Sequence, residues 1–144
     1  MKKLIILLVL CSSFASEGIS QFHYGAGAQL IFDSTIFGVQ GKAFYEYDET
    51  WRGSGTFTLH LEDGINWTVD LDAHYLLFNI GDGFNFAPIA GISITNFDGA
   101  AGTDIGINLG AFFDLNFQER HVYIEPKLVL EGVKSVAVSA GVFF

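Results

Sequence analysis

The chain has 144 residues, a formal net charge of −9, one cysteine and 15% aromatic residues. This length suffices for one domain. The acidic balance disfavours nucleic acid as a partner, because such binding depends on Lys and Arg neutralising phosphates, and a single cysteine provides no internal disulfide.

The first twenty residues have the layout of a secretory signal peptide. Two lysines precede an apolar run over 4–10, and small and polar residues follow. The run is far shorter than the roughly 18 residues of a spanning helix. Cleavage fits after Ala15 or after Ser20, and we favour Ser20 because alternating hydrophobicity begins two residues later. The expected division is a signal peptide over 1–20 and one domain over 21–144.

From residue 22 onward, apolar and polar residues alternate with a period of two, which is typical of β-strands with one apolar face. In 51–61 the odd positions are Trp, Gly, Gly, Phe, Leu and Leu, while the even positions are Arg, Ser, Thr, Thr and His. The longest connection is expected at 96–104. The pattern predicts an all-β fold, an eight-stranded antiparallel up-and-down barrel. Its strands are expected at 22–32, 37–47, 51–61, 65–77, 84–94, 105–117, 122–130 and 135–144.

Alternation alone leaves two arrangements open, because the apolar face points inward in a soluble barrel and outward in a transmembrane barrel. Strands of about ten residues are long enough to cross a bilayer when tilted. The aromatic residues also gather toward the strand ends, where membrane interfaces favour amphipathic rings. We therefore expect a transmembrane barrel with an aromatic girdle. The girdle residues are Tyr24, Tyr45, Tyr47, Trp51, Trp67, Tyr75 and Phe117.

The polar face carries charges suited to the narrow lumen of an eight-stranded barrel. Extending the hairpin registers places Glu46 opposite Arg52, Arg52 opposite His74, and Asp114 opposite Glu125. Sealed from water, such charges must pair. The predicted polar network of the lumen consists of Glu46, Arg52, Asp72, His74, Asp114, Glu125 and Lys127.

No catalytic, metal or cofactor site is expected. A carboxylate pair at Asp114 and Glu125 is suited to acid–base chemistry, but its neutralisation by Lys127 is the favoured interpretation. His60 and His74 fall at different heights on their strands, which disfavours a shared metal. A patch of small residues on the apolar face leaves open the docking of a lipid or a second barrel. Its members are Gly41, Ala43, Gly53, Gly55 and Ala73.

The segments FNFAPIAGISIT, IGINLGAFFDLNF and VYIEPKLVLEG, with the signal peptide, the alternating strands and a terminal Phe, resemble the small outer-membrane β-barrel family typified by the OmpA membrane domain and OmpX. The resemblance covers the whole mature chain. It implies export to the outer membrane of a Gram-negative bacterium, and a C-terminal strand that the barrel assembly machinery reads as a signal. The matching positions are Val136, Val138, Ala140, Val142 and Phe144.

The expected function is that of an integral outer-membrane barrel with a structural or interaction role. It is expected to be non-catalytic and non-conducting, with outer-membrane lipid and the assembly machinery as partners. The alternative is a soluble exported barrel of lipocalin type, in which the apolar face points inward and binds a lipophilic ligand.

Overall fold

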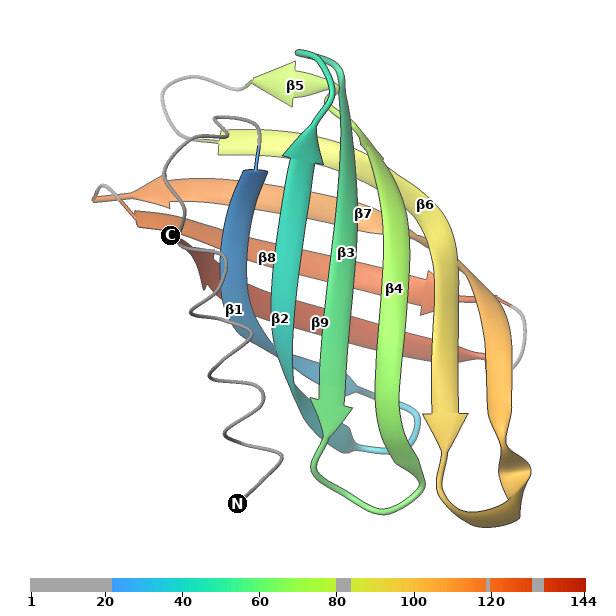
Figure 1. The fold of residues 1–144 in the computed structure, drawn as a ribbon. Helices are drawn as coiled ribbons and strands as arrows, with labels where there is room; N and C mark the ends of the chain where they lie inside the picture. Colours follow the sequence, from blue (N-terminus) through green and yellow to red (C-terminus); the bar gives the residue numbers. More distant parts are fainter. Residues whose placement is uncertain (1–21, 80–83, 119, 131–133) are drawn as a thin grey trace.

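The computed structural model describes residues 22–79, 84–118, 120–130 and 134–144, which form the antiparallel barrel of Figure 1. The strands are β1 (Phe22–Ile31), β2 (Ile36–Glu46), β3 (Trp51–His60), β4 (Ile65–Tyr75), β5 (Phe78–Asn79), β6 (Phe84–Phe97), β7 (Thr103–Phe117), β8 (Arg120–Val129) and β9 (Ser135–Phe143). A 3-10 helix, η1 (Gly99–Ala101), lies between β6 and β7. Within these residues, no helix is long and apolar enough to cross a membrane.

The nine strand elements make eight barrel strands. β4 and β5 both pair with β6, and the register shifts by one residue between the pairs His74↔Ile89 and Phe78↔Phe86. β5 thus continues β4 beyond a bulge, which is a common way to bend a strand at the rim of a barrel. Each remaining strand pairs with its sequence neighbours, and β1 pairs with β9 to close the sheet. The predicted eight-stranded up-and-down barrel is confirmed.

The connection between β6 and β7 is shorter than the predicted 96–104, because polar residues continue the ladder. Asn96 is opposite Thr103, and its side-chain Nδ2 donates to Thr103 Oγ1 at 3.2 Å. The turn proper is 98–102, where Asp98 accepts a hydrogen bond from Gly99 N. Hydrophobic alternation stops before this strand pair does, which is why the prediction ended the first strand too early, at 94, and began the second too late, at 105.

The connection between β7 and β8 corrects a second prediction. Phe117 is opposite Arg120, so only two residues separate the strands, where the sequence predicted the four residues 118–121. Gln118 adopts a φ of 49° there, consistent with a tight two-residue turn. The observed register between β7 and β8 therefore differs by two residues from the predicted one. Every side chain keeps its predicted face of the sheet, but the residue opposite it on the neighbouring strand changes. Asp114 lies opposite Tyr123, and the predicted pairing of Asp114 with Glu125 is wrong.

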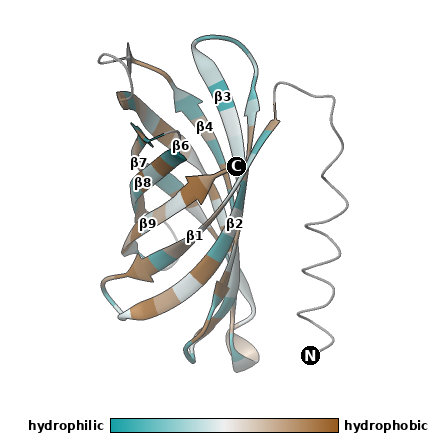
Figure 2. Ribbon diagram, turned by 90° about the vertical axis from the view of Figure 1, so that its left-hand side faces the viewer, coloured by the Kyte–Doolittle hydropathy of each residue, from teal (hydrophilic) through white to brown (hydrophobic). Residues whose placement is uncertain are grey.

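The distribution of side chains is the reverse of that in a soluble protein, with polar side chains inside the barrel and large hydrophobic ones outside. Among the described residues, 18 polar or charged residues are buried against nine hydrophobic ones, and 24 large hydrophobic residues are exposed. Hydropathy alternates along the strands in Figure 2, and the buried positions are those of the polar parity. The lipocalin-type alternative is therefore wrong for this chain, because its apolar parity faces outward.

Glycines make room for large side chains in the lumen. At the closing seam Gly27 lies opposite Gly141, and a Cβ atom on them would lie 2.5 Å and 2.7 Å from the hydroxyl of Tyr123. On the outer face, by contrast, a Cβ atom at Gly41 would meet nothing within 4 Å. The lumen glycines are thus required by packing, whereas Gly41 is not.

Gly141→Ala should destabilise the barrel by roughly 1–3 kcal/mol, because the added methyl overpacks the site against Tyr123. Gly41→Ala is the matched control and should be neutral or slightly stabilising, since alanine restricts the unfolded chain. Urea unfolding of the barrel refolded into lipid vesicles measures both changes. Equal stability of the two variants would contradict the packing role of the seam glycines.

Candidate functional site: the barrel lumen

The side chains of the lumen form three layers along the barrel axis. We call the end where β1 begins and β9 finishes the terminal end, and the opposite end, with the turns β1–β2, β3–β4, β6–β7 and β8–β9, the distal end. An aromatic layer lies toward the terminal end, a charged layer follows it, and a cavity opens toward the distal end.

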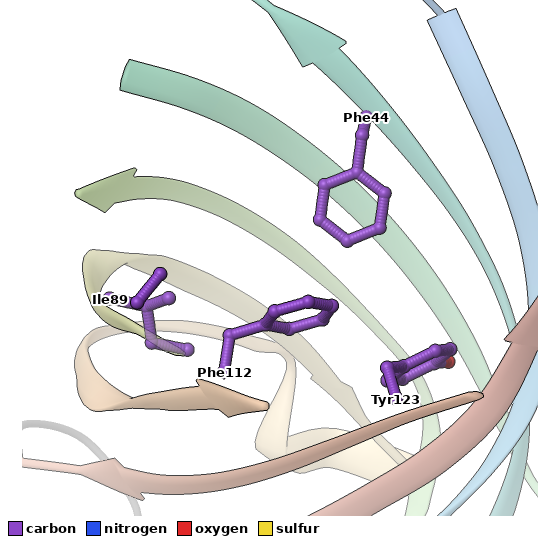
Figure 3. Close-up of a cluster of buried hydrophobic side chains, with 5 residues drawn as sticks. Phe44, Ile89, Phe112 and Tyr123 are labelled. Atoms are coloured by element: carbon purple, nitrogen blue, oxygen red, sulfur yellow. The ribbon is translucent and has the colours of Figure 1, made fainter. Parts of the chain in front are cut away.

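The aromatic layer fills the lumen from several sides. Its buried members are Phe44, Ala87, Ile89, Phe112 and Tyr123, with Leu76 and Phe143 packed against them. Figure 3 shows Phe44 from β2, Ile89 from β6, Phe112 from β7 and Tyr123 from β8 converging in the lumen. The rings of Phe44 and Phe112 meet edge to face, with centroids 5.2 Å apart, a favoured geometry for aromatic pairs.

Arg52 belongs to this layer through its guanidinium group. The group lies 4.4 Å from the ring centroid of Phe44 and 4.7 Å from that of Phe112. Nε and Nη2 have no hydrogen-bond partner among the described residues. Arg52 is thus held by cation–π contacts.

Lys127 is the centre of the charged layer. Its ammonium group lies 2.7 Å from Asp72 Oδ2, 3.2 Å from Asp70 Oδ2 and 3.1 Å from Glu125 Oε1. Asp70 and Asp72 are on β4 and Lys127 is on β8, three strands away around the closed sheet. The ion pairs with Asp70 and Asp72 therefore cross the lumen and join opposite walls, whereas Glu125 lies on β8 with Lys127.

Two further residues complete the cluster. Lys42 on β2 forms an ion pair with Glu125, and Asn108 Nδ2 donates to Asp70 Oδ1 at 3.2 Å and to Asp72 Oδ1 at 3.0 Å. Each of these side chains is almost fully buried. We call this set the cross-lumen cluster. It consists of Lys42, Asp70, Asp72, Asn108, Glu125 and Lys127.

The charges of the cluster are held by ion pairs and hydrogen bonds. It contains two cations and three carboxylates, and each ammonium group contacts at least one carboxylate. Because desolvating an ion costs several kcal/mol unless it is paired and hydrogen-bonded, these contacts, with the hydrogen bonds from Asn108, are what allow so many charges to be buried together.

The predicted network residues do not all meet. Glu46 lies opposite Arg52, and Arg52 opposite His74, as expected. The Glu46 side chain, however, is 44% exposed and its Oε1 lies 3.6 Å from His23 Nε2. Arg52 forms no ion pair with Glu46 or Asp72, because its guanidinium turns to the aromatic rings. Adjacency in the register fixes the Cα partner of a long side chain but not the direction of its charged end.

Asp114 also stands apart from the cluster. Its Oδ1 lies 3.5 Å from Nδ1 of His121, whose side chain is 52% exposed. This contact is near the terminal end and follows from the two-residue turn after Phe117. Because of this two-residue turn, Asp114 lies opposite Tyr123 and not opposite Glu125.

Sequence reasoning missed Lys42, Asp70 and Asn108. All three lie on the polar parity of predicted strands, so their inward direction was available from the alternation. Their partners were not, because these contacts join strands that are not neighbours in the sheet. Such contacts depend on how the barrel closes across its interior.

A serine–histidine pair is the arrangement closest to a catalytic one in the described part of the chain. Ser54 Oγ lies 2.8 Å from His74 Nε2, and both residues are buried. His74 Nδ1 has no hydrogen-bond partner there, so the third group that orients the base in nucleophilic enzymes is missing. The pair is accounted for as part of the packed lumen.

Comparison with known proteins supports the fold. No protein-family model and no curated protein matches the sequence. Among solved structures, the N-terminal β-barrel domain of Pseudomonas aeruginosa OprF is similar, with 17% identity over 89% of this chain and 100% of that chain and a TM-score of 0.58. The Yersinia pestis outer membrane protein Ail, solved in a phospholipid bilayer nanodisc, matches at 15% identity over 86% and 99% of the two chains, with a TM-score of 0.56.

A designed protein gives a similar result. The de novo designed TMB2.3 matches at 12% identity over 90% of this chain and 96% of that chain, with a TM-score of 0.61. The chain has the fold of the small outer-membrane β-barrels. At these identities the similarity concerns the fold alone.

The outer surface of this outer-membrane-type barrel places aromatic rings near both ends. At the terminal end Trp51 lies opposite Tyr75, with ring centroids 4.9 Å apart. Trp67 stacks against Phe57 toward the distal end, at 6.4 Å. Of the remaining girdle residues, Tyr24, Tyr45, Tyr47 and Phe117 lie toward the terminal end.

The final strand presents its alternate residues outward. Val136, Ala140 and Val142 are exposed and Val138 is half-buried. Phe144 follows β9 with 84% of its surface exposed, and its backbone N donates to Tyr24 O at 2.9 Å. The last residue is therefore held at the seam by its backbone while its ring stays free on the outside.

Lys127→Met should destabilise the barrel by roughly 3–5 kcal/mol, because it leaves Asp70, Asp72 and Glu125 buried with too few cations. Arg52→Met should cost less, about 2 kcal/mol, since Arg52 makes cation–π contacts in place of ion pairs. Urea unfolding in lipid vesicles at neutral pH measures the two losses.

A rescue variant separates charge from packing. Adding Asp70→Asn and Asp72→Asn to Lys127→Met removes the unpaired carboxylates and should recover more than half of the lost stability. A larger loss for Arg52→Met than for Lys127→Met, or no recovery in the triple variant, would contradict the assigned role of Lys127.

Proposed function

We propose that the protein is an integral β-barrel of the Gram-negative outer membrane, exported by the signal peptide over 1–20, with a structural or interaction role. The observation that carries the proposal is the inverted polarity of the barrel, with charges inside and large hydrophobic side chains outside. A closed sheet with this polarity suits a bilayer, because every backbone group is paired between strands and the apolar face meets hydrocarbon. Outer-membrane lipid is accordingly the proposed environment and partner.

The proposed protein neither conducts nor catalyses. The aromatic layer and the cross-lumen cluster lie one above the other and both extend across the lumen. Opening a path would separate buried ion pairs without water to replace them, which costs several kcal/mol. The Ser54–His74 pair lies within this packed region and has no orienting partner for the imidazole.

The distal rim argues against the binding of sulfated polysaccharides. Ail has been solved in complex with the heparin analogue sucrose octasulfate, a polyanion. The described charged residues at the distal rim of the present chain are Asp33, Glu62, Asp63, Asp98, Asp104 and Lys134. Five carboxylates against one ammonium group repel such a ligand, so an adhesive role of that kind is not proposed.

The C-terminal strand is proposed to be the signal for the outer-membrane assembly machinery. Its outward residues and the free ring of Phe144 form a continuous apolar edge next to the closing seam. Because β9 closes the sheet by pairing with β1, its edge is open for recognition until that pairing forms.

Leu71→Arg tests the membrane assignment. Leu71 lies in the middle of β4 on the outward face, 51% exposed, and arginine at the bilayer midplane should cost roughly 2–4 kcal/mol. Leu61→Arg is the matched control, since Leu61 follows β3 at the distal end and should cost about 0–1 kcal/mol. Unfolding in lipid vesicles measures both losses. Equal effects, or partition of the parent protein into the soluble fraction without detergent, would contradict the proposal.

Deletion of Phe144 should lower the yield of assembled barrel in cells far more than it lowers refolding into detergent. Heat-modifiable mobility on gels measures both yields. Phe117→Ala is the control, because Phe117 is another exposed ring at the terminal end but lies outside the final strand. An unchanged cellular yield after deletion of Phe144 would contradict the assembly role.

A further inference from the structure

The distal third of the lumen contains a cavity of about 130 Å³, which the membrane role does not explain. Asp70 and Lys127 of the cross-lumen cluster form its floor, and its mouth lies among turn residues of the distal rim. An apolar protein cavity of roughly 150 Å³ holds one benzene molecule. The distal cavity therefore has room for one molecule of about five to eight non-hydrogen atoms, but not for a lipid acyl chain.

Hydrophobic side chains line the middle of the cavity. Ile31, Ile65 and Ala137 belong to one buried hydrophobic cluster, against which Phe97 packs, and all four residues line the cavity. They come from β1, β4, β9 and β6, so they surround the space from several sides. The surface that the wall presents to a ligand is mainly apolar.

The polar side chains of the wall require little from a ligand. Gln29 Nε2 donates to Ser139 Oγ at 3.3 Å. Thr68 Oγ1 lies 3.0 Å from His60 Nε2 and 3.4 Å from Thr95 Oγ1. Within the described part of the chain, no buried side-chain nitrogen or oxygen that lacks a hydrogen-bond partner belongs to a wall residue. Because a buried water molecule needs several polar partners, this wall suits an apolar ligand better than water.

The charged groups around the cavity are also engaged within the protein. At the floor, Lys127 contacts three carboxylates, one of which is Asp70. At the mouth, Asp33 and Asp104 each accept a hydrogen bond from a backbone N–H group. A charged ligand would leave water for an apolar wall and find no free counter-ion at the floor, which is unfavourable. The cavity therefore favours a neutral ligand.

We propose that the distal cavity binds one small, neutral, apolar molecule of the size of benzene or toluene. The molecule enters from the distal mouth and lies among Ile31, Ile65 and Ala137, and the burial of its apolar surface there drives binding. Because the cross-lumen cluster closes the floor, the site holds the molecule and does not pass it on. The inference depends on the fold and on this cavity, so its failure would leave the membrane assignment intact.

The experiment uses the full mature barrel in lipid nanodiscs, with methyl groups labelled for NMR. Toluene is the probe, and N-methylpyridinium chloride is its cationic analogue of equal shape. Toluene should shift the methyl signals of Ile31, Ile65 and Ala137 in a saturable manner, and should bind more tightly than N-methylpyridinium by about tenfold or more. Signals of Leu71 on the outer face report the partition of toluene into lipid.

Two variants change the volume of the cavity without changing a charge. Ala137→Leu fills the cavity and should abolish toluene binding. Ala26→Leu is the matched control and should bind toluene as the parent does, because Ala26 is exposed on the outer face of β1. Ile65→Ala enlarges the cavity, so naphthalene, which is too large for the parent, should shift the methyl signals of Ile31 and Ala137. This gain of binding requires a folded barrel.

A charge variant separates apolar binding from capture of a cation. The double change Asp33→Asn and Asp104→Asn should alter toluene affinity by less than about twofold. Equal affinity for toluene and N-methylpyridinium, a large loss of toluene binding in the double variant, or unchanged binding in Ala137→Leu would each overturn the proposal. So would shifts at the cavity methyl groups that follow those of Leu71 without saturating.

Refolding of each variant is verified by heat-modifiable mobility on gels. If Ala137→Leu does not refold, Ile65→Ala decides, and failure of naphthalene to bind to the refolded Ile65→Ala barrel would contradict the proposed site.

Discussion

Satisfying charges inside a closed sheet is the constraint on which this structure depends. In the proposed membrane environment, hydrocarbon outside the barrel offers no hydrogen bonds, so the sheet must close and each inward charge must find its partner within the lumen. Lys127 meets that requirement by contacting three carboxylates from two opposite walls. The cluster holds β4 and β8 at a fixed separation, which strand pairing alone does not do.

The other lumen layers follow from the same constraint. An eight-stranded barrel leaves space for side chains but not for bulk water, so the region beyond the charges is filled by aromatic rings. Bulky rings in turn need small residues beside them, and Gly27 and Gly141 provide this room for Tyr123 at the closing seam. Arg52 is buried against Phe44 and Phe112, so the aromatic layer also holds one positive charge.

The alternation of the sequence was sufficient to predict the fold and the face of nearly every side chain. Because side chains alternate with a period of two, an error of two residues in a turn leaves the inward and outward faces of the strands unchanged. Between β7 and β8 the observed register differs from the predicted one by two residues, and Asp114 and Glu125 still point inward. The interaction partners of the lumen side chains were less predictable. The short turn after Phe117 displaced Asp114, and the cross-lumen contacts of Lys42, Asp70 and Asn108 depend on closure of the whole barrel. Pairing across a hairpin can be read from its loop, whereas pairing across a lumen requires the three-dimensional arrangement of all eight strands.

The central claim is that the charged face is inside and the apolar face meets lipid. NMR cross-relaxation between lipid acyl chains and protein side chains in nanodiscs tests it most directly. The account predicts contacts from acyl-chain protons to Leu71 and Leu109, and none to Thr56 or Ser139, which are buried in the lumen. Acyl-chain contacts to Thr56 or Ser139, with none to Leu71 and Leu109, would contradict it.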